Sequence, residues 1–298
     1  MRQAFDATLA TAMRLQERER AVFGDAEAAL AALARGLAEH TAPPLARWSP
    51  ARLRVLDRLC GAGHSLPGGD GEIVRLAAPL GLDASASVLV FGGGAGGPAR
   101  AIAAASGASV WDTASAPEQA EAARRASHAL VLDPVRERSA ITVLSSVADA
   151  LGEDAGLAML QLVADAPFEP DDAETARWCR AEGCPHALPT RVHVTRALAQ
   201  LGFRVGAVSD ESERHVRQVM AAWRVLLAEL GGSRPEGVEA AGMVTEAERW
   251  LSRVRLLRSG RIRLLRWEAR RSAAAETRAH TQSRTGARRT LRFVGIRA

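Results

Sequence analysis

The sequence feature that most constrains the fold is an apolar run that ends in a cluster of glycines, Ser87–Pro98 (SVLVFGGGAGGP). The run Val88–Phe91 has the length and the β-branched and aromatic content of a buried strand. Pro98 suits the first turn of a helix, because its ring fixes φ and its missing N–H would be unpaired there. The turn between them contains Gly92, Gly93, Gly94, Gly96 and Gly97. A strand, a glycine turn and a helix N-terminus bring backbone N–H groups close to a ligand, so the segment indicates a nucleotide-like ligand.

Strands and helices alternate along the rest of the chain. Further strands are expected at Gly107–Asp112, His128–Leu132, Leu157–Ala164, Phe203–Val208 and Ile262–Trp267. Helices are expected at Glu72–Pro79, Ala99–Ser106, Pro117–Ala126, Ser139–Leu151, Val192–Leu201, Glu211–Leu230 and Pro235–Ser259. This alternation predicts an α/β fold, with a Rossmann-like, mostly parallel sheet covered by helices on both faces.

The N-terminal region is expected to be helical. Helical spacing of apolar residues predicts helices at Gln3–Phe23 and Asp25–His40. A third helix, Ser49–Cys60, begins with a Ser-Pro pair in which the serine caps and the proline takes the first position. The glycine-rich segment Gly61–Gly71 is interpreted as a loop. Its His64 and Asp70 are interpreted as solvated loop residues, with contact to a ligand as the alternative.

Length and cysteine content restrict the class of protein. A chain of 298 residues allows one large or two small domains. We expect a helical region at 1–70, a Rossmann-like domain at 71–271 and a flexible basic tail at 272–298. Three cysteines are too few, and odd in number, for a disulfide framework. The sequence has neither a signal-peptide pattern nor an apolar stretch of about 18 residues, so a cytoplasmic protein is expected.

The positive charge is concentrated near the C-terminus. All basic residues are arginines, and those after Leu251 outweigh the acids there, which leaves the preceding part of the chain mildly acidic. Clustered arginines allow binding of nucleic acid or an anionic membrane through counterion release. The tail has few aromatic residues and no recognisable recognition module, so a solvated tail in an arginine-biased proteome is the favoured interpretation.

The glycine turn belongs to a longer motif. The segment VLVFGGGAGGPARAIAAASGASVW, followed by PEQAEAARR, resembles the nucleotide-binding half of class I S-adenosylmethionine-dependent methyltransferases. Gly92, Gly94 and Gly96 fall on the three glycines of their first motif. The resemblance implies S-adenosylmethionine as the cofactor, and its binding residues would be Gly92, Gly93, Gly94, Gly96 and Asp112.

Later segments extend the resemblance over about Gly71–Arg271. His186–Pro189 before a helix, then Leu201–Phe203 and a strand, are similar to the C-terminal half of the family. The closing hairpin-like Arg261–Arg270 is similar as well. The family fold is therefore expected across most of the chain.

Two positions and one missing strand depart from the family pattern. The first strand normally carries an acid at the position of Val90, and the second strand normally ends in a ribose-binding acid at the position of Ala114. Asp112 lies two residues earlier, on the same strand face but one step lower. A βαβ unit takes about 30 residues, so Ser109–Leu132 has no room for the family's third strand, and the sheet should lack one edge strand. These departures imply weak or absent cofactor binding.

The sequence contains two other candidate sites. Cys179, Cys184, His186 and His193 could bind zinc, but their spacing is uncommon, and no metal is expected. Asp165 follows an apolar strand, where it would face a substrate or serve as a turn residue. The tryptophans are distributed one to an element and are interpreted as packing anchors.

Three functions remain open from the sequence. The first is a methyltransferase that aligns a small-molecule acceptor for in-line attack. The second is a non-catalytic protein of the same fold, a pseudoenzyme that binds a protein partner through its N-terminal helices. The third is a dinucleotide-binding oxidoreductase, because Gly92, Gly94 and Gly97 fit G-x-G-x-x-G with Asp112 as the acid about 20 residues on. No motif in the sequence specifies a methyl acceptor or an oligomeric state.

Overall fold

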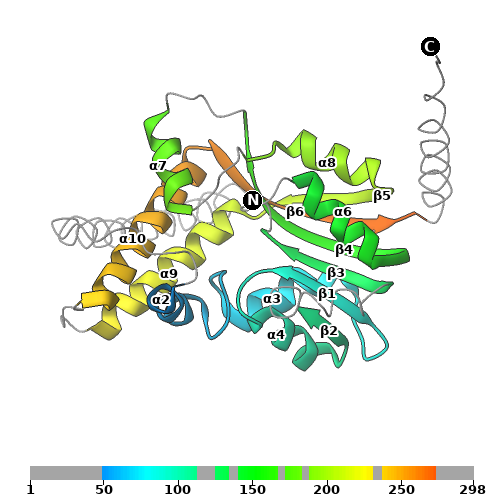
Figure 1. Ribbon diagram of the computed structural model, residues 1–298, viewed down its shortest axis with the longest axis horizontal. Coiled ribbons are helices and arrows are strands. Elements are labelled where there is room, and N and C mark those ends of the chain that lie inside the picture. The colour runs from blue at the N-terminus through cyan, green and yellow to red at the C-terminus, as the bar shows by residue number, and fades with distance from the viewer. Residues whose placement is uncertain are drawn as a thin grey trace, which may run out of the picture.

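A six-stranded sheet lies between two layers of helices in the computed structural model (Figure 1). The structure describes residues 49–112, 125–133, 140–166, 172–182, 188–230 and 237–272. The strand order is β2-β1-β3-β4-β6-β5. The strands are β1 (Ser87–Gly92), β2 (Ser109–Asp112), β3 (Ala126–Leu132), β4 (Leu151–Ala164), β5 (Phe203–Asp210) and β6 (Ile262–Arg271).

The pairing confirms the Rossmann-like, mostly parallel sheet. Strands β2, β1, β3 and β4 pair in parallel, and β6 runs antiparallel between β4 and β5. Parallel neighbours need crossover connections, and helix α4 (Gly97–Ser106) and helix α6 (Ala140–Ala150) lie in two of them. Strand β2 forms the sheet edge among the described residues, and only residues 113–124 lie between it and Arg125 before β3. This agrees with the predicted lack of an edge strand.

Each face of the sheet buries its own apolar core. On one face, Val88, Leu130, Leu160 and their neighbours pack against several helices, while on the other, residues such as Leu89 pack against α6 and α8. The helices of the first face are α2 (Pro50–Cys60), α3 (Gly69–Ala77), α4, α7 (Ala173–Glu182), α9 (Ser212–Leu230) and α10 (Gly237–Arg258); α8 is Arg191–Gln200. Strict alternation along buried strands explains the division.

Four tryptophans confirm the packing interpretation. Trp178, Trp223, Trp250 and Trp267 have almost no exposed surface. The first three belong to the core beneath α7, α9 and α10, and Trp267 belongs to the opposite core. There its indole N–H donates to Thr195 Oγ1 at 3.1 Å.

The start of α2 confirms the Ser-Pro prediction. The Ser49 side chain accepts the Arg52 N–H, and Pro50 takes the first helical position. Helix α2 packs against α10 and α9. The predicted helices at Gln3–Phe23 and Asp25–His40 lie outside the described residues, as does the tail beyond residue 272.

Several predicted boundaries need correction. Helix α3 begins at Gly69, inside the predicted loop, and a 3-10 turn η1 (Ala78–Leu80) follows it. Ala126 belongs to β3, although it was assigned to a helix at Pro117–Ala126 whose residues 117–124 lie outside the described range. Helix α7 was not predicted, because its few apolar residues gave no helical periodicity.

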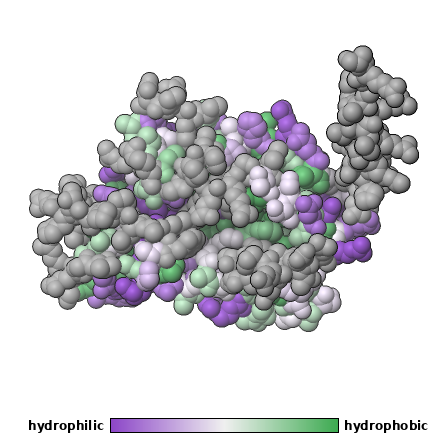
Figure 2. Space-filling view, viewed as in Figure 1, coloured by the Kyte–Doolittle hydropathy of each residue, from purple (hydrophilic) through white to green (hydrophobic). Residues whose placement is uncertain are grey.

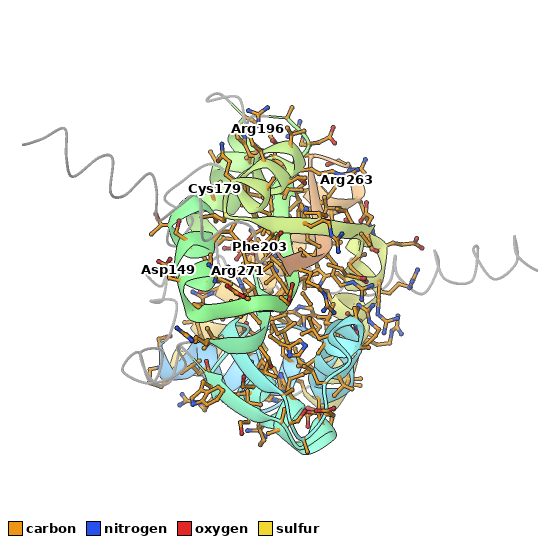
Figure 3. The ribbon with its side chains drawn as sticks, turned by 90° about the vertical axis from the view of Figure 1, so that its right-hand side faces the viewer. Asp149, Cys179, Arg196, Phe203, Arg263 and Arg271 are labelled. Atoms are coloured by element: carbon orange, nitrogen blue, oxygen red, sulfur yellow. The ribbon has the colours of Figure 1, made fainter. Side chains whose placement is uncertain are left out.

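The end of β6 is tied to the end of α6. The guanidinium of Arg271 donates to the carbonyl O of Ala148 at 2.5 Å and to that of Leu151. In the view of Figure 3, Arg271 lies beside Asp149 of α6 and Phe203 of β5. A cation at a helix C-terminus complements the unpaired carbonyls and the helix dipole, so Arg271 secures α6 to the antiparallel side of the sheet.

Apolar and polar residues are mixed over the visible surface of the described residues (Figure 2). Among the described residues as a whole, the exposed large apolar side chains are Val74, Val192 and Val225, which lie on three different helices. None of the helices in the described ranges combines the length and hydropathy required to cross a membrane.

Candidate functional site

The glycine turn connects the carboxyl end of β1 to the first turn of α4. Gly92, Gly93, Gly94 and Gly96 have φ values of 76°, 84°, 137° and 86°. Side chains other than glycine rarely adopt such values. The sequence-predicted turn is therefore present, and its glycines are required by the path of the backbone.

These glycines also allow close packing within the protein itself. A Cβ atom on Gly92 would overlap the carbonyl O of Leu132, and one on Gly93 would lie 2.5 Å from Leu132 Cδ1. A Cβ atom on Gly94 would overlap the carbonyl O of Gly63. The glycine cluster is thus explained in part by contacts with the chain's own backbone, before any ligand is considered.

The Gly61–Ser65 loop lies directly on the glycine turn. The Ala95 and Gly97 N–H groups both donate to the carbonyl O of Gly63, at 2.8 and 3.1 Å. The Ser65 N–H donates to the carbonyl O of Gly93 at 2.8 Å. Two donors at the start of α4, where an anionic ligand group would bind, therefore already have an acceptor.

His64 of this loop is buried, so its interpretation as a solvated residue is wrong. It is 3% exposed, and its Nε2 lies 2.7 Å from Asp70 Oδ1. The Asp70 side chain is 65% exposed, as expected for a loop or helix end. Sequence reasoning missed the burial because the pairing of His64 with Gly94 joins segments 30 residues apart.

Asp112 lies at the end of β2, beneath the glycine turn. It pairs in register with Val90, and both residues are buried. Gly92 lies two residues further along β1, or about 6.6 Å at the rise of a strand. The Asp112 Cα is therefore level with the interior of β1, and the position of Ala114 lies outside the described residues.

Asp165 follows β4 at the same edge of the sheet. Its side chain is exposed and lies 3.6 Å from Arg263 Nε, in a surface ion pair. Its N–H donates to the carbonyl O of Arg261 at 3.2 Å, which continues the β4–β6 pairing past the end of β4. Asp165 and the glycine turn lie on strands separated by β3.

The proposed zinc ligands are only partly described. Cys179 lies in α7, and His193 lies in the first turn of α8, where its Nδ1 is 3.2 Å from Thr190 Oγ1. Cys184 and His186 lie outside the described residues. Within the described ranges, no group of three histidine, cysteine or acidic side chains could hold a metal ion.

Cys60 should resist thiol reagents in the folded protein. Burial raises the pKa of its thiol to about 12, so the thiolate is scarce at pH 8. In a Cys179→Ser, Cys184→Ser variant, Ellman's reagent should titrate no thiol until denaturant is added. Rapid reaction of one thiol in native buffer would contradict the burial of the Cys60 side chain at the end of α2.

A chain of buried charges was not predicted from the sequence. It runs from Arg52 of α2 through α10 and α7 to Asp133, which follows β3. The members are Arg52, Glu246, Arg249, Glu182, Arg253 and Asp133, all almost fully buried. The guanidinium groups of Arg249 and Arg253 also lie 4.5 and 4.7 Å from the Trp250 ring centroid. The spacing of residues 246, 249 and 253 along one helix face around Trp250 was the available signal.

At Asp133, this series of buried ion pairs reaches the carboxyl edge of the parallel strands. Asp133 has a φ of 48°, and its Oδ1 accepts the Gln161 side-chain amide at 3.1 Å and the Leu162 N–H at 3.3 Å. Arg253 Nη2 lies 3.9 Å from Asp133 Oδ2. Functional groups of α/β sheets lie at this edge, but here these polar groups are occupied with one another.

A second group of charges joins α3 to α9 beside a narrow pocket. Arg75 binds both Glu72 and Glu211, at 2.6 and 2.8 Å, and Arg214 binds Glu72 at 2.9 Å. Leu160 and Leu264 of the sheet, together with the two glutamates, are among the residues that line the pocket. The carboxylates that line the pocket already have arginine partners. These ion pairs are suited to holding α3 and α9 together.

Glu72 should make stability depend on acid pH. Burial raises the pKa of its carboxyl, but hydrogen bonds from Arg75, Arg214 and Gln218 outweigh burial and lower the pKa to about 2. The stabilisation is therefore complete above the ordinary value of 4.5 and is lost as the pH falls towards 2. Glu72→Gln should lower the free energy of unfolding by about 2 kcal/mol at pH 7. The loss is no larger because Arg214 is partly exposed, which weakens the pairing.

Urea unfolding at several pH values checks this effect. The difference between the wild type and Glu72→Gln should shrink steadily between about pH 4.5 and pH 2. A difference that stays constant over this range would contradict the assigned role of Glu72.

Comparison with solved structures identifies the fold. A cyclopropane synthase from Mycobacterium tuberculosis matches with a TM-score of 0.57 and 16% identity, over 75% of this chain and 95% of that chain. A phosphoethanolamine N-methyltransferase from Haemonchus contortus matches with a TM-score of 0.58 and 13% identity, over 74% of this chain and 56% of that chain. This is the fold of the S-adenosylmethionine-dependent methyltransferases.

The methyltransferase fold is all that these likenesses establish, because the identities are low. The cyclase SpnF also matches, with a TM-score of 0.50 and 14% identity, over 74% of this chain and 93% of that chain. No protein-family model matches the sequence, and no curated protein matches it either. A shared fold does not specify a function, which depends on the residues of the site itself.

Proposed function

We propose that this chain is a methyltransferase-like protein with a degraded cofactor site, which binds S-adenosylmethionine weakly and acts as a binding or regulatory module. The observation that carries the proposal is the register of β1 and β2. It sets Asp112 level with Val90, below the glycine turn and not beyond the strand end. The partner of such a module is a protein or a small molecule.

The residues present fit the cofactor only in part. The glycine turn between β1 and α4 is present, with positive φ at Gly92, Gly93, Gly94 and Gly96. The ribose hydroxyls need a carboxylate acceptor, and an unpaired polar group costs about 1–3 kcal/mol when desolvated. Asp112, the nearest candidate for the ribose, lies a strand step too low. Separately, Val90 offers no side-chain acceptor at the position where the family carries the acid of its first strand. Two donors at the start of α4 are bound to Gly63.

The second candidate is an active methyltransferase with a small-molecule acceptor. Asp133 and Gln161 favour it, since they lie at the carboxyl edge of β3 and β4, where this fold places functional groups. Solved neighbours in complex with S-adenosylhomocysteine support an adenosyl ligand for this fold. The mutual pairing of Asp133 and Gln161 supports the non-catalytic proposal instead. A dinucleotide is the third candidate, and its ribose acid would again be Asp112.

Thermal unfolding with each ligand at about 1 mM tests the three candidates. A dissociation constant of about 100 μM or weaker should raise Tm by no more than about 4 °C. NADH should give no shift. A rise of about 10 °C with S-adenosylmethionine would correspond to micromolar binding and would overturn the proposal. The same rise with NADH would establish the dinucleotide candidate.

A further inference from the structure

We infer that the Gly61–Ser65 loop is an autoinhibitory strap that competes with the ligand for the glycine turn. The inference rests on the proposed function, because it assigns a regulation to the same turn. One carbonyl oxygen, that of Gly63, accepts the N–H groups of both Ala95 and Gly97. These are the donors that an acceptor atom of a ligand would use at the start of α4.

The contact leaves no space for a second acceptor. A Cβ atom on Gly63 would lie 2.8 Å from the carbonyl O of Ala95 and 2.9 Å from Gly97 N. A Cβ atom on Gly97 would lie 2.7 Å from the carbonyl O of Gly63. Backbone packs directly on backbone here, so a ligand can reach these donors only when the Gly61–Ser65 loop moves away.

Besides its three backbone hydrogen bonds to the glycine turn, the loop is held in place by side-chain hydrogen bonds. Asp57 Oδ1 accepts the Gly63 N–H at 2.8 Å, and the Arg100 guanidinium donates to the carbonyl O of Ala62 at 2.7 Å. Both bonds are exposed to solvent. Gly61 and Gly63, with φ values of 93° and 75°, give the backbone freedom to move. The main resistance to opening is the buried His64 ring.

The loop can therefore be released by a substitution outside the ligand's own contacts. Gly63→Ala adds a methyl group that overlaps the turn, and Asp57→Ala removes an anchor and leaves the turn intact. Gly260→Ala is the matched control for Gly63→Ala. Gly260 has the same φ of 75°, but a Cβ there meets nothing within 4 Å. The control thus carries the backbone strain without displacing the loop.

Calorimetry with S-adenosylhomocysteine and amide hydrogen exchange of the full chain test the strap. Relative to Gly260→Ala, Gly63→Ala should bind the ligand at least tenfold tighter. The Ala95 and Gly97 amides should exchange at least tenfold faster in the absence of ligand. Asp57→Ala should shift both readouts in the same direction, and it decides the outcome if Gly63→Ala does not fold.

The outcomes separate the strap from the proposed function. If the loop variants bind the ligand with unchanged affinity, the strap is overturned, whether or not the amides exchange faster. Weak binding by the wild type would still support the proposed function in that case. Low-micromolar binding by the wild type overturns the proposed function, and the comparison with Gly260→Ala still tests the strap.

Discussion

Glu182→Gln should lower the free energy of unfolding by about 3–5 kcal/mol, because it leaves two buried guanidinium groups without their shared carboxylate. Glu182 Oε1 accepts Arg253 Nε at 2.7 Å, and Oε2 accepts Arg249 Nη1 at 3.3 Å. All three side chains are almost fully buried. Glutamine keeps the shape of glutamate, so the loss reports the missing charge and the one acceptor oxygen that an NH2 group replaces.

Glu174→Gln is the matched control on the same helix. Glu174 is about half exposed and lies 3.6 Å from Arg261. Breaking this surface pair should cost less than about 0.5 kcal/mol. Urea unfolding followed by tryptophan fluorescence measures both variants. Equal losses for the two would show that the charge chain of α7 and α10 is not buried as described.

Gly92→Ala should lower the free energy of unfolding by about 3–5 kcal/mol, because it combines backbone strain with a steric overlap. The residue has a φ of 76°, and its Cβ would overlap the carbonyl O of Leu132. Gly92 and Leu132 are paired in the β1–β3 ladder, so neither strand can withdraw without losing hydrogen bonds.

Gly81→Ala is the control that introduces the backbone strain of a positive φ without the steric overlap. Gly81 has a φ of 62° and open space around a Cβ. Its substitution should cost about 1–2 kcal/mol, the backbone penalty alone. Chemical denaturation of both variants gives the comparison. A free-energy cost for Gly92→Ala no larger than that for Gly81→Ala would contradict the close packing of Gly92 against Leu132.

The local signals in the sequence were sufficient for most of the sheet. The Ser49-Pro50 pair fixed the start of α2, and the apolar run before Gly92 located β1. Alternating strands and helices, with the family resemblance, predicted the mostly parallel sheet, in which β2 forms the edge among the described residues. Each signal lies within one element or follows from the order of elements, and periodicity detects such patterns.

The details of the site depend on contacts between distant segments. The sequence placed His64 in solvent, since no local pattern indicates that its loop lies on a turn 30 residues later. Arg52 meets Glu246 across 194 residues, and each is an ordinary helix charge by itself. The level of Asp112 relative to Val90 depends on strand register, which composition does not specify.

Calorimetric titration of the wild-type protein with S-adenosylhomocysteine tests the central claim most directly. The claim is that the turn remains while the acceptors that would anchor the cofactor are missing or displaced. We expect a dissociation constant above about 100 μM, or a binding free energy no stronger than about −5.5 kcal/mol. Asp112→Ala should leave this value unchanged. Micromolar binding that Asp112→Ala abolishes would contradict the account.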